Sequence, residues 1–274
     1  MAPTPHAIPR TEVHHLRATE IDQEYRVSVA LPRSYERRRH RYPVLIVLDA
    51  DIGFGTAVEG HRLMSLDDGL EEVLIVGIGY PVDDLQQTLV VRTRDLTPSV
   101  DQAKLAELSA GGLGDDAASF IGGADRFLAF IEHELLPFLG ARYRADTTDL
   151  GIAGSSFGGL FGVWCLFEHP GVFGRYLLTS PSLWWDTEVA FRYERSRWTA
   201  SHELEARLFM SVGGSEATRM VAPFRRLVAT LRRRRYHGLR LTSKVFRDET
   251  HRSVGGGAMW RGLLELYPGS RPPD

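Results

Sequence analysis

Two short runs of aliphatic residues constrain the fold of this chain more than any other feature. Residues 42–51 read YPVLIVLDAD and residues 71–81 read EEVLIVGIGYP, and neither run alternates between apolar and polar positions. Continuous apolar strands are typical of parallel sheets that helices cover on both faces. EYRVSVALP (24–32) does alternate, like a half-exposed strand. Four later runs also predict strands: DLGIAG, GRYLLTS, RLFMSVGG and LTSKVF.

Longer patterns with helical spacing lie between these runs. Residues 124–143 and 216–238 are the clearest, and the second ends in four arginines, which complement the dipole at a helix C-terminus. The alternation of strands and helices predicts an α/β fold with a mostly parallel, twisted sheet and helices on both faces.

The size of the chain favours one substantial domain, residues 1–274. Its 274 residues are 43% hydrophobic, which suits a single large core. The least regular stretch is 98–123, which contains SAGGLGDDAASFIGG. Loops this long inside a compact domain are usually functional, so we expect a lid or a pocket wall there.

A pair of serines between glycines follows the run DLGIAG. Residues 154–158, GSSFG, fit the pattern G-x-S-x-G, with a predicted strand before them and a predicted helix after them. This context is that of a nucleophile elbow, and it predicts Ser156 as the nucleophile, with an ordinary turn as the alternative. Side chains at 154 and 158 are expected to collide with the neighbouring strand and helix, and Gly159 to allow closer packing of the helix.

A serine hydroxyl needs a base, and the expected chain order is serine, acid, histidine. Three histidines follow at a useful distance: His202, His237 and His251. Only His251, in RDETHRSVGGG, lies in a loop after the last predicted strand, at the correct edge of the sheet. We therefore predict His251 as the base.

The acid has two candidates. Glu216 follows the glycine turn in LFMSVGGSEATRM, where the third member of a triad belongs. Asp248 lies three residues before His251, which is too close along the chain to reach behind the imidazole easily. Glu216 is favoured, and Asp248 or a serine–histidine dyad without an essential acid are the alternatives.

Acyl transfer also requires two hydrogen-bond donors for the oxyanion. The backbone N–H of Phe157 is one. The loop that begins at Asp49 supplies the other, with the N–H of Asp51 as first candidate and that of Ile52 next. An acid in this loop is alternatively a turn residue.

A resemblance to a known family is carried by YPVLIVLDAD, RTRDLTPS, GGADRFLAFIEHELLPFL, AGSSFGGLFGVWCLFEHPGVFGRYLLTSPSLWW and DETHRSV. The chain resembles the "Putative esterase" branch of the α/β-hydrolases from about Thr11 to Leu266. Within that branch it is similar to esterases that open catecholate siderophore trilactones such as enterobactin and salmochelin. The resemblance implies the α/β-hydrolase fold, catalysis by Ser156 and His251, and Glu216 as acid, although some siderophore esterases work as a dyad.

Two further pairs of residues have both a binding and a structural interpretation. Adjacent tryptophans, Trp184 and Trp185, cannot both face one side of a regular element, so either at least one lines the cleft or they fill the core. Arg92 and Arg94 precede Asp95 and either bind an anionic ester substrate, such as a ferric siderophore, or brace the loop through an Arg–Asp pair.

Charge and composition give no reason to expect a partner other than the substrate. The net charge is −2, and no apolar segment is long enough to span a membrane, so neither nucleic acid nor a membrane is an expected partner. The scattered histidines form no metal motif, and we expect no cofactor and no metal. A single cysteine, Cys165, suits a reducing compartment, and we expect a cytoplasmic location.

These patterns predict a serine hydrolase that cleaves a carboxylic ester through an acyl-Ser156 intermediate. The favoured substrate is a siderophore trilactone or a similar macrocyclic or bulky aryl ester. A general carboxylesterase or a feruloyl-type esterase is the first alternative. A catalytically silent relative that serves as a binding protein is the alternative from another class.

Overall fold

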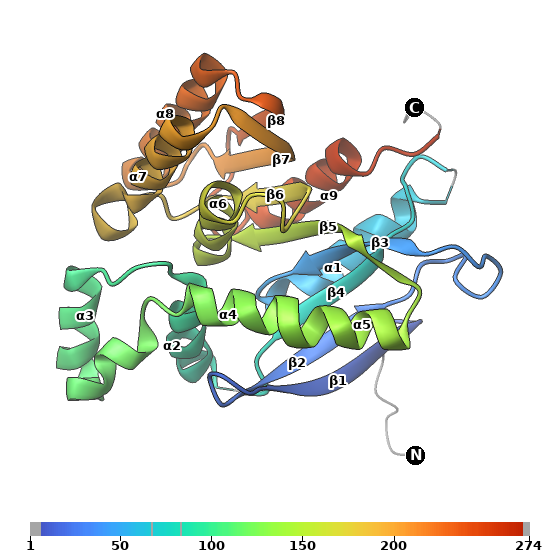
Figure 1. Ribbon diagram of the computed structural model, residues 1–274, viewed down its shortest axis with the longest axis horizontal. Coiled ribbons are helices and arrows are strands. Elements are labelled where there is room, and N and C mark those ends of the chain that lie inside the picture. Colours follow the sequence, from blue (N-terminus) through green and yellow to red (C-terminus); the bar gives the residue numbers. More distant parts are fainter. Residues whose placement is uncertain (1–6, 67, 83, 271–274) are drawn as a thin grey trace.

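The sheet has eight strands in the order β1-β2-β4-β3-β5-β6-β7-β8 (Figure 1). The computed structural model describes residues 7–66, 68–82 and 84–270. β1 pairs with β2, and β2 with β4, in antiparallel fashion, and all other pairs are parallel. The strands are β1 (Thr11–Ala18), β2 (Gln23–Ala30), β3 (Tyr42–Val47), β4 (Leu74–Gly79), β5 (Ala145–Ser155), β6 (Arg175–Thr179), β7 (Glu203–Gly213) and β8 (His237–Phe246).

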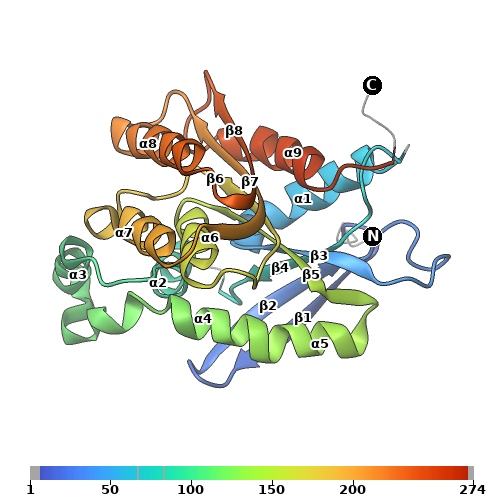
Figure 2. The same cartoon turned by 45° about the horizontal axis from the view of Figure 1, so that its top comes forward.

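Helices cover both faces of this sheet (Figure 2). One face carries α1 (Ala50–Met64) and α9 (Val254–Leu266). The other carries α2 (Leu85–Leu96), α4 (Ala124–Phe130), α5 (Leu136–Arg142), α6 (Phe157–Glu168), α7 (Trp185–Ala200) and α8 (Thr218–Arg234). A π-helical segment, Ile131–Leu135, joins α4 to α5. The predicted α/β architecture is therefore confirmed.

The central strands are buried on both faces, as their continuous apolar runs predict. Every residue of β4 is buried, and in β3 only Pro43 is partly exposed. Their side chains alternate between two apolar clusters. One cluster lies under α1 and α9, and the larger one lies under the helices of the opposite face. This two-sided burial holds the carboxyl ends of the parallel strands, where the elbow lies, in fixed positions.

The structure differs from the sequence patterns in one strand and one segment. The sequence patterns miss β1, an edge strand whose side chains are mostly exposed or half-buried and therefore lack an apolar run. The segment 98–123 is mostly helical rather than an irregular loop: it contains α3 (Gln102–Leu108), a π-helical turn at Ser109–Leu113 and a 3₁₀ helix at Gly114–Phe120. Short helices with several glycines carry little periodicity, so the pattern does not reveal them.

Within the described residues, no helix combines the length and the apolar character that crossing a lipid bilayer requires.

Candidate active site

Strand β5 ends in the turn that carries Ser156. The backbone of Ser156 has φ 59° and ψ −115°, which L-residues rarely adopt, and α6 begins at the next residue, Phe157. A strained strand-to-helix turn of this kind is the geometry of a nucleophile elbow. The Ser156 N–H donates to the carbonyl oxygen of Thr179 in β6 (3.0 Å), which holds the turn against the sheet.

Two glycines are required for this close packing. A side chain at Gly154 would overlap the carbonyl group of Gly158, and a Cβ at Gly159 would lie 2.9 Å from the Cα of Pro181. At Gly158 the expected collision is wrong, because a Cβ there would lie 3.5 Å from its nearest neighbour, Asp49 Oδ2, an ordinary contact distance. Glycine is therefore needed for space at 154 and 159, but not at 158.

His251 and Glu216 form a hydrogen-bonded pair at the same edge of the sheet. Nδ1 of His251 lies 2.7 Å from Oε2 of Glu216, whose side chain is fully buried. The other carboxylate oxygen accepts hydrogen bonds from the hydroxyl of Ser180 and from the N–H of Gly213. Burial alone would raise the pKa of Glu216, but these three hydrogen bonds outweigh it and hold the pKa below its usual value. Because Nδ1 is engaged, Nε2 is the nitrogen left to accept a proton.

Main-chain hydrogen bonds between two loops bring this pair together. In the β7–α8 loop, the N–H of Gly214 donates to the carbonyl oxygen of Phe246 (2.7 Å), and that of Ser215 donates to Glu249 (3.0 Å). His251 occupies the turn before α9. Asp248 is exposed, and in the described part of the chain its side chain makes no hydrogen bond or ion pair. Of the two candidate acids, Glu216 is thus the one beside the imidazole.

The hydroxyl of Ser156 lies beside a second serine. Its Oγ is 3.3 Å from the Oγ of buried Ser182, whose N–H donates to the carbonyl oxygen of Ser156 (3.0 Å). Among the described residues no hydrogen bond joins Ser156 to His251, and the side chain of His251 is 41% exposed. Catalytic hydrogen bonds often tighten only in the complex with substrate, so we expect the serine–imidazole contact to form there.

Two N–H groups next to the elbow have no acceptor among the described residues: those of Phe157, at the start of α6, and Asp51, in the first turn of α1. The first N–H groups of a helix lack partners within the helix and favour negative charge. The N–H of Ile52 donates to the carbonyl oxygen of Asp49 (3.0 Å) and is therefore occupied. Phe157 and Asp51 remain the candidate oxyanion donors.

Two ion pairs hold the turn that presents Asp51. The carboxylate of Asp49, a residue with φ 51°, accepts two hydrogen bonds of 2.7 Å from the guanidinium of Arg92. The carboxylate of Asp51 accepts a hydrogen bond from the N–H of Tyr80 (2.9 Å) and pairs with Arg26. The turn is thus braced from β2, from the end of β4 and from α2.

A family model described as "Putative esterase" matches residues 18–224, which is more than half of the chain and includes both Ser156 and Glu216. The chain belongs to this esterase family.

Relatives in this family are named for siderophores. Ferri-bacillibactin esterase BesA of Bacillus subtilis is 34% identical over 182 residues, which cover 65% of this chain and 61% of BesA, less than two thirds of its length. The siderophore triacetylfusarinine C esterase of Aspergillus fumigatus is 29% identical over 223 residues, 78% of this chain and 71% of that protein. Among solved structures, the BES protein from Bacillus cereus matches with a TM-score of 0.83 and 25% identity over 97% of each chain. The fold is the α/β-hydrolase fold.

The two tryptophans have different environments. Trp185 has no exposed surface, and its Nε1 donates to the carbonyl oxygen of Ser99 (3.2 Å). The prediction that it binds substrate is therefore wrong, because its indole is part of the core. Trp184 is partly exposed, its ring centroid lies 6.2 Å from that of Phe157, and the guanidinium of Arg219 lies 5.1 Å above it. Trp184 thus lies at the edge of the sheet that carries Ser156.

For the two arginines the structure favours the bracing alternative. Arg94 Nε donates to the buried carboxylate of Asp95 (2.6 Å), and Arg92 forms its pair with Asp49. Arg92 also lies 5.4 Å from the centroid of the Phe157 ring, so it packs against the elbow. A contact of Arg92 with substrate stays a prediction.

Sequence reasoning did not single out Ser180, Ser182 and Arg219 as site residues. The two serines follow β6, at the edge where a parallel sheet places its functional loops, and this position is the only signal that could have found them. No signal pairs Arg219 with Trp184, because α8 and the start of α7 meet only in the folded chain. Within the described residues, no group of three or more His, Cys, Asp or Glu side chains is arranged to hold a metal ion.

Proposed function

We propose that this chain is a serine esterase in which Ser156 is the nucleophile, His251 the general base and Glu216 the acid that orients it. The observation that carries the proposal is the 2.7 Å hydrogen bond between His251 and Glu216 at the edge where Ser156 occupies its strained turn. Membership of the esterase family supports the same assignment.

In the proposed reaction, Ser156 Oγ attacks the ester carbonyl carbon while Nε2 of His251 takes the hydroxyl proton. The N–H groups of Phe157 and Asp51 stabilise the oxyanion of the tetrahedral intermediate. The intermediate collapses, and the leaving alcohol receives the proton from His251. Water activated by His251 then hydrolyses the acyl-Ser156 ester. Ionised Glu216 stabilises the imidazolium in both halves of the reaction.

The proposed substrate class is a siderophore lactone or a similar bulky aryl ester. Two relatives support it, since one is named a ferri-bacillibactin esterase and the other a siderophore triacetylfusarinine C esterase. Trp184 and Phe157 form an aromatic surface beside Ser156, with the guanidinium of Arg219 stacked on the ring of Trp184. Such a surface suits an anionic aryl ligand, because rings stack and guanidinium groups attract negative charge. A general or feruloyl-type esterase is the alternative, and a cytoplasmic location is part of the same proposal.

Substitution of Ser156 by alanine tests the activity. We expect Ser156→Ala to lower kcat for p-nitrophenyl acetate by about 10⁴- to 10⁶-fold with the fold intact, because no other hydroxyl occupies the elbow. Ser155→Ala, at the preceding residue, is the matched control and should retain more than half of the activity. Loss of activity in Ser155→Ala with retention in Ser156→Ala would assign the nucleophile role to Ser155 instead. Inactivity of the wild-type protein on every ester would favour a binding protein.

Substitution of Trp184 tests the substrate class. If its ring contacts a bulky substrate, Trp184→Ala should lower kcat/KM for a catechol trilactone by roughly ten- to a hundredfold and leave p-nitrophenyl acetate nearly unaffected. The two substrates are compared on the same enzyme preparation, with and without iron bound to the trilactone. Wild-type enzyme that cleaves simple aryl esters but no catechol lactone would favour the general esterase.

A further inference from the structure

Three arginines lie side by side across the strands near the end of the sheet opposite the elbow. Arg175 in β6 is the register partner of Arg207 in β7, and Arg207 is the register partner of Arg240 in β8. Partners in adjacent strands project to the same face of a sheet. Like charges placed directly opposite each other are destabilising, so this arrangement requires compensation.

The three arginines are compensated unequally by acidic residues of the protein. Arg175 forms ion pairs with Asp149 and Glu71, and its guanidinium lies 4.6 Å from the ring centroid of Tyr267. Within the described part of the chain, no hydrogen bond or ion pair engages the guanidinium of Arg207 or Arg240. Glu71 attracts Arg207 electrostatically but makes no direct contact with it, and Arg240 is exposed, so neither guanidinium has a hydrogen-bonded counter-ion among the described residues.

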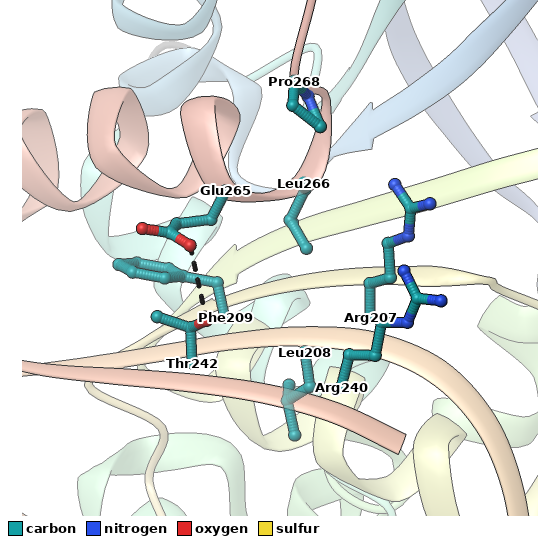
Figure 3. Close-up of a pocket in the computed structure, with 8 residues that line it drawn as sticks. All are labelled: Arg207, Leu208, Phe209, Arg240, Thr242, Glu265, Leu266 and Pro268. Carbon is teal, nitrogen blue, oxygen red and sulfur yellow. Dashed lines mark hydrogen bonds between the residues drawn. The ribbon is translucent and has the colours of Figure 1, made fainter. Parts of the chain in front are cut away.

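Arg207 and Arg240 line a cavity of ≈ 250 Å³ (Figure 3). Their side chains extend in the same direction at one side of the cavity, whereas Glu265 lies at the other side. Glu265 accepts hydrogen bonds from Thr242 and Arg261, so its charge is already partnered. The side of the cavity that Arg207 and Arg240 line is therefore positively charged.

A larger cavity of ≈ 630 Å³ adjoins the first and shares Arg207 and Pro268 with it. Four more basic residues line it: Arg38, His40, Arg41 and Arg175. The acidic residues that line it are Asp68, Glu71 and Glu72, of which Glu71 pairs with Arg175 and Glu72 with Ser34.

We propose that Arg207 and Arg240 form a binding site for a phosphate group, and that the larger cavity holds the remainder of a phosphomonoester. A dianion placed between two guanidinium groups removes their mutual repulsion, and each guanidinium offers a planar pair of donors that matches phosphate oxygens. The site lies toward the amino-terminal ends of β7 and β8, whereas Ser156 lies at the carboxyl end of the sheet. Binding there is independent of the ester site and of the function proposed above.

Phosphate binding is tested by calorimetric titration at constant ionic strength, with inorganic phosphate and adenosine monophosphate as the two probes and no ester present. Wild-type protein should bind at least one probe saturably. Arg207→Gln and Arg240→Gln should each weaken binding about tenfold or more, because a charge-assisted contact is lost. Arg225→Gln, on the exposed face of α8, removes the same charge and should change binding less than twofold.

The variants also supply a folding control. Without phosphate, Arg240→Gln should unfold at the same temperature as wild type or higher, because it removes like-charge repulsion. Equal affinity for both probes assigns the site to free phosphate, and tenfold tighter binding of the monophosphate assigns it to a phosphomonoester. The absence of saturable binding to the wild type, or equal weakening by Arg225→Gln, would overturn the proposal.

Discussion

Each oxygen of the Glu216 carboxylate has a hydrogen-bond partner, and this is what keeps a fully buried acid ionised. Oε2 faces His251, and Oε1 accepts from Ser180 and from the N–H of Gly213. Ser180 is itself buried and has φ 45°, so the end of β6 adopts an unusual backbone conformation directly beside this carboxylate. The acid is therefore rigidly placed, which an orienting role requires.

We expect Glu216→Gln to lower kcat by about 10²- to 10⁴-fold, because a neutral amide orients the imidazole poorly and does not stabilise imidazolium. Asp248→Asn makes the same change of charge on an exposed carboxylate three residues from His251 and should retain activity within twofold. Steady-state hydrolysis of p-nitrophenyl acetate measures both. Losses below tenfold in both variants would indicate a serine–histidine dyad.

The same substitution has a predictable effect on stability. The pKa of Glu216 in the folded chain lies below the unperturbed value of 4.5, so the ionised carboxylate stabilises the fold at higher pH, and this contribution is lost as the pH falls through the folded-state pKa. The difference in unfolding free energy between wild type and Glu216→Gln should be largest near neutral pH and shrink on acidification below about pH 4.5. Urea unfolding at several pH values measures it, and a difference that grows in acid would contradict the assignment.

Helix α2 links the core to the elbow through buried charges. Asp95 has no exposed surface and accepts hydrogen bonds from the hydroxyl of Tyr25 in β2 (2.7 Å) and from Arg94 (2.6 Å). Burial raises the pKa of Asp95, and the hydrogen bonds from Arg94 and Tyr25 oppose that rise. One turn earlier, Arg92 reaches Asp49 beside the elbow. Helix α2 is therefore bonded both to β2, through Asp95, and to the turn after β3, through Arg92.

Removal of the buried carboxylate should loosen this helix. We expect Asp95→Ala to lower the free energy of unfolding by about 3–5 kcal/mol, because Arg94, whose side chain is only 12% exposed, then loses its counter-ion. Glu107→Ala in α3 removes an exposed carboxylate that pairs with Lys104 and should change stability by less than about 0.5 kcal/mol. Urea denaturation at neutral pH compares them, and similar losses in both variants would show that Asp95 does not hold α2.

Helix α3, where the sequence predicts a loop, is attached to the start of α7. The carboxylate of Asp101 caps α3 by accepting from the N–H of Lys104 (2.8 Å) and also accepts from the N–H of Asp186 at the start of α7 (2.8 Å). Two residues earlier, Ser99 accepts the hydrogen bond of Trp185. The segment is thus attached to the core at its beginning.

At the scale of the whole molecule, one sheet separates two apolar clusters, and neither cluster is complete without it. Leu166 of α6 is buried in the larger cluster and Leu263 of α9 in the smaller one. Since both helices pack on β6, from opposite faces of one sheet, we expect the chain to unfold as one unit.

Truncation on each face tests the prediction that residues 1–274 form one domain. Leu166→Ala and Leu263→Ala should each cost about 2–5 kcal/mol and shift a single common transition. Far-UV circular dichroism and tryptophan fluorescence should report the same midpoint in each variant. Separate transitions, each moved by only one of the substitutions, would divide the chain into two units.

The features that could be read directly from the amino-acid order are those with a local cause. Continuous apolar runs identify β3 and β4 because strands covered on both faces need no polar side. The G-x-S-x-G pattern locates the elbow at Ser156 because the sharp turn and the space it needs at Gly154 and Gly159 involve only residues close to the serine in the chain. The sequence does not predict the polar edge strand β1 or the short helices of 98–123, because their residues contact solvent on several sides and leave no periodic pattern.

Features that depend on distant contacts could be recognised only in the folded chain. The sequence favours Glu216 over Asp248 but leaves both open, and only the folded chain shows the hydrogen bonds between the β7–α8 and β8–α9 loops that place Glu216 beside His251. Trp184 and Trp185 are adjacent in the chain, yet their backbone directions place one in the core and the other at the surface. The register of β6, β7 and β8 aligns three arginines that lie more than thirty positions apart. Such relations depend on how elements distant in the chain pack together. This packing is determined by the free energy of the whole molecule, and no local sequence pattern predicts it.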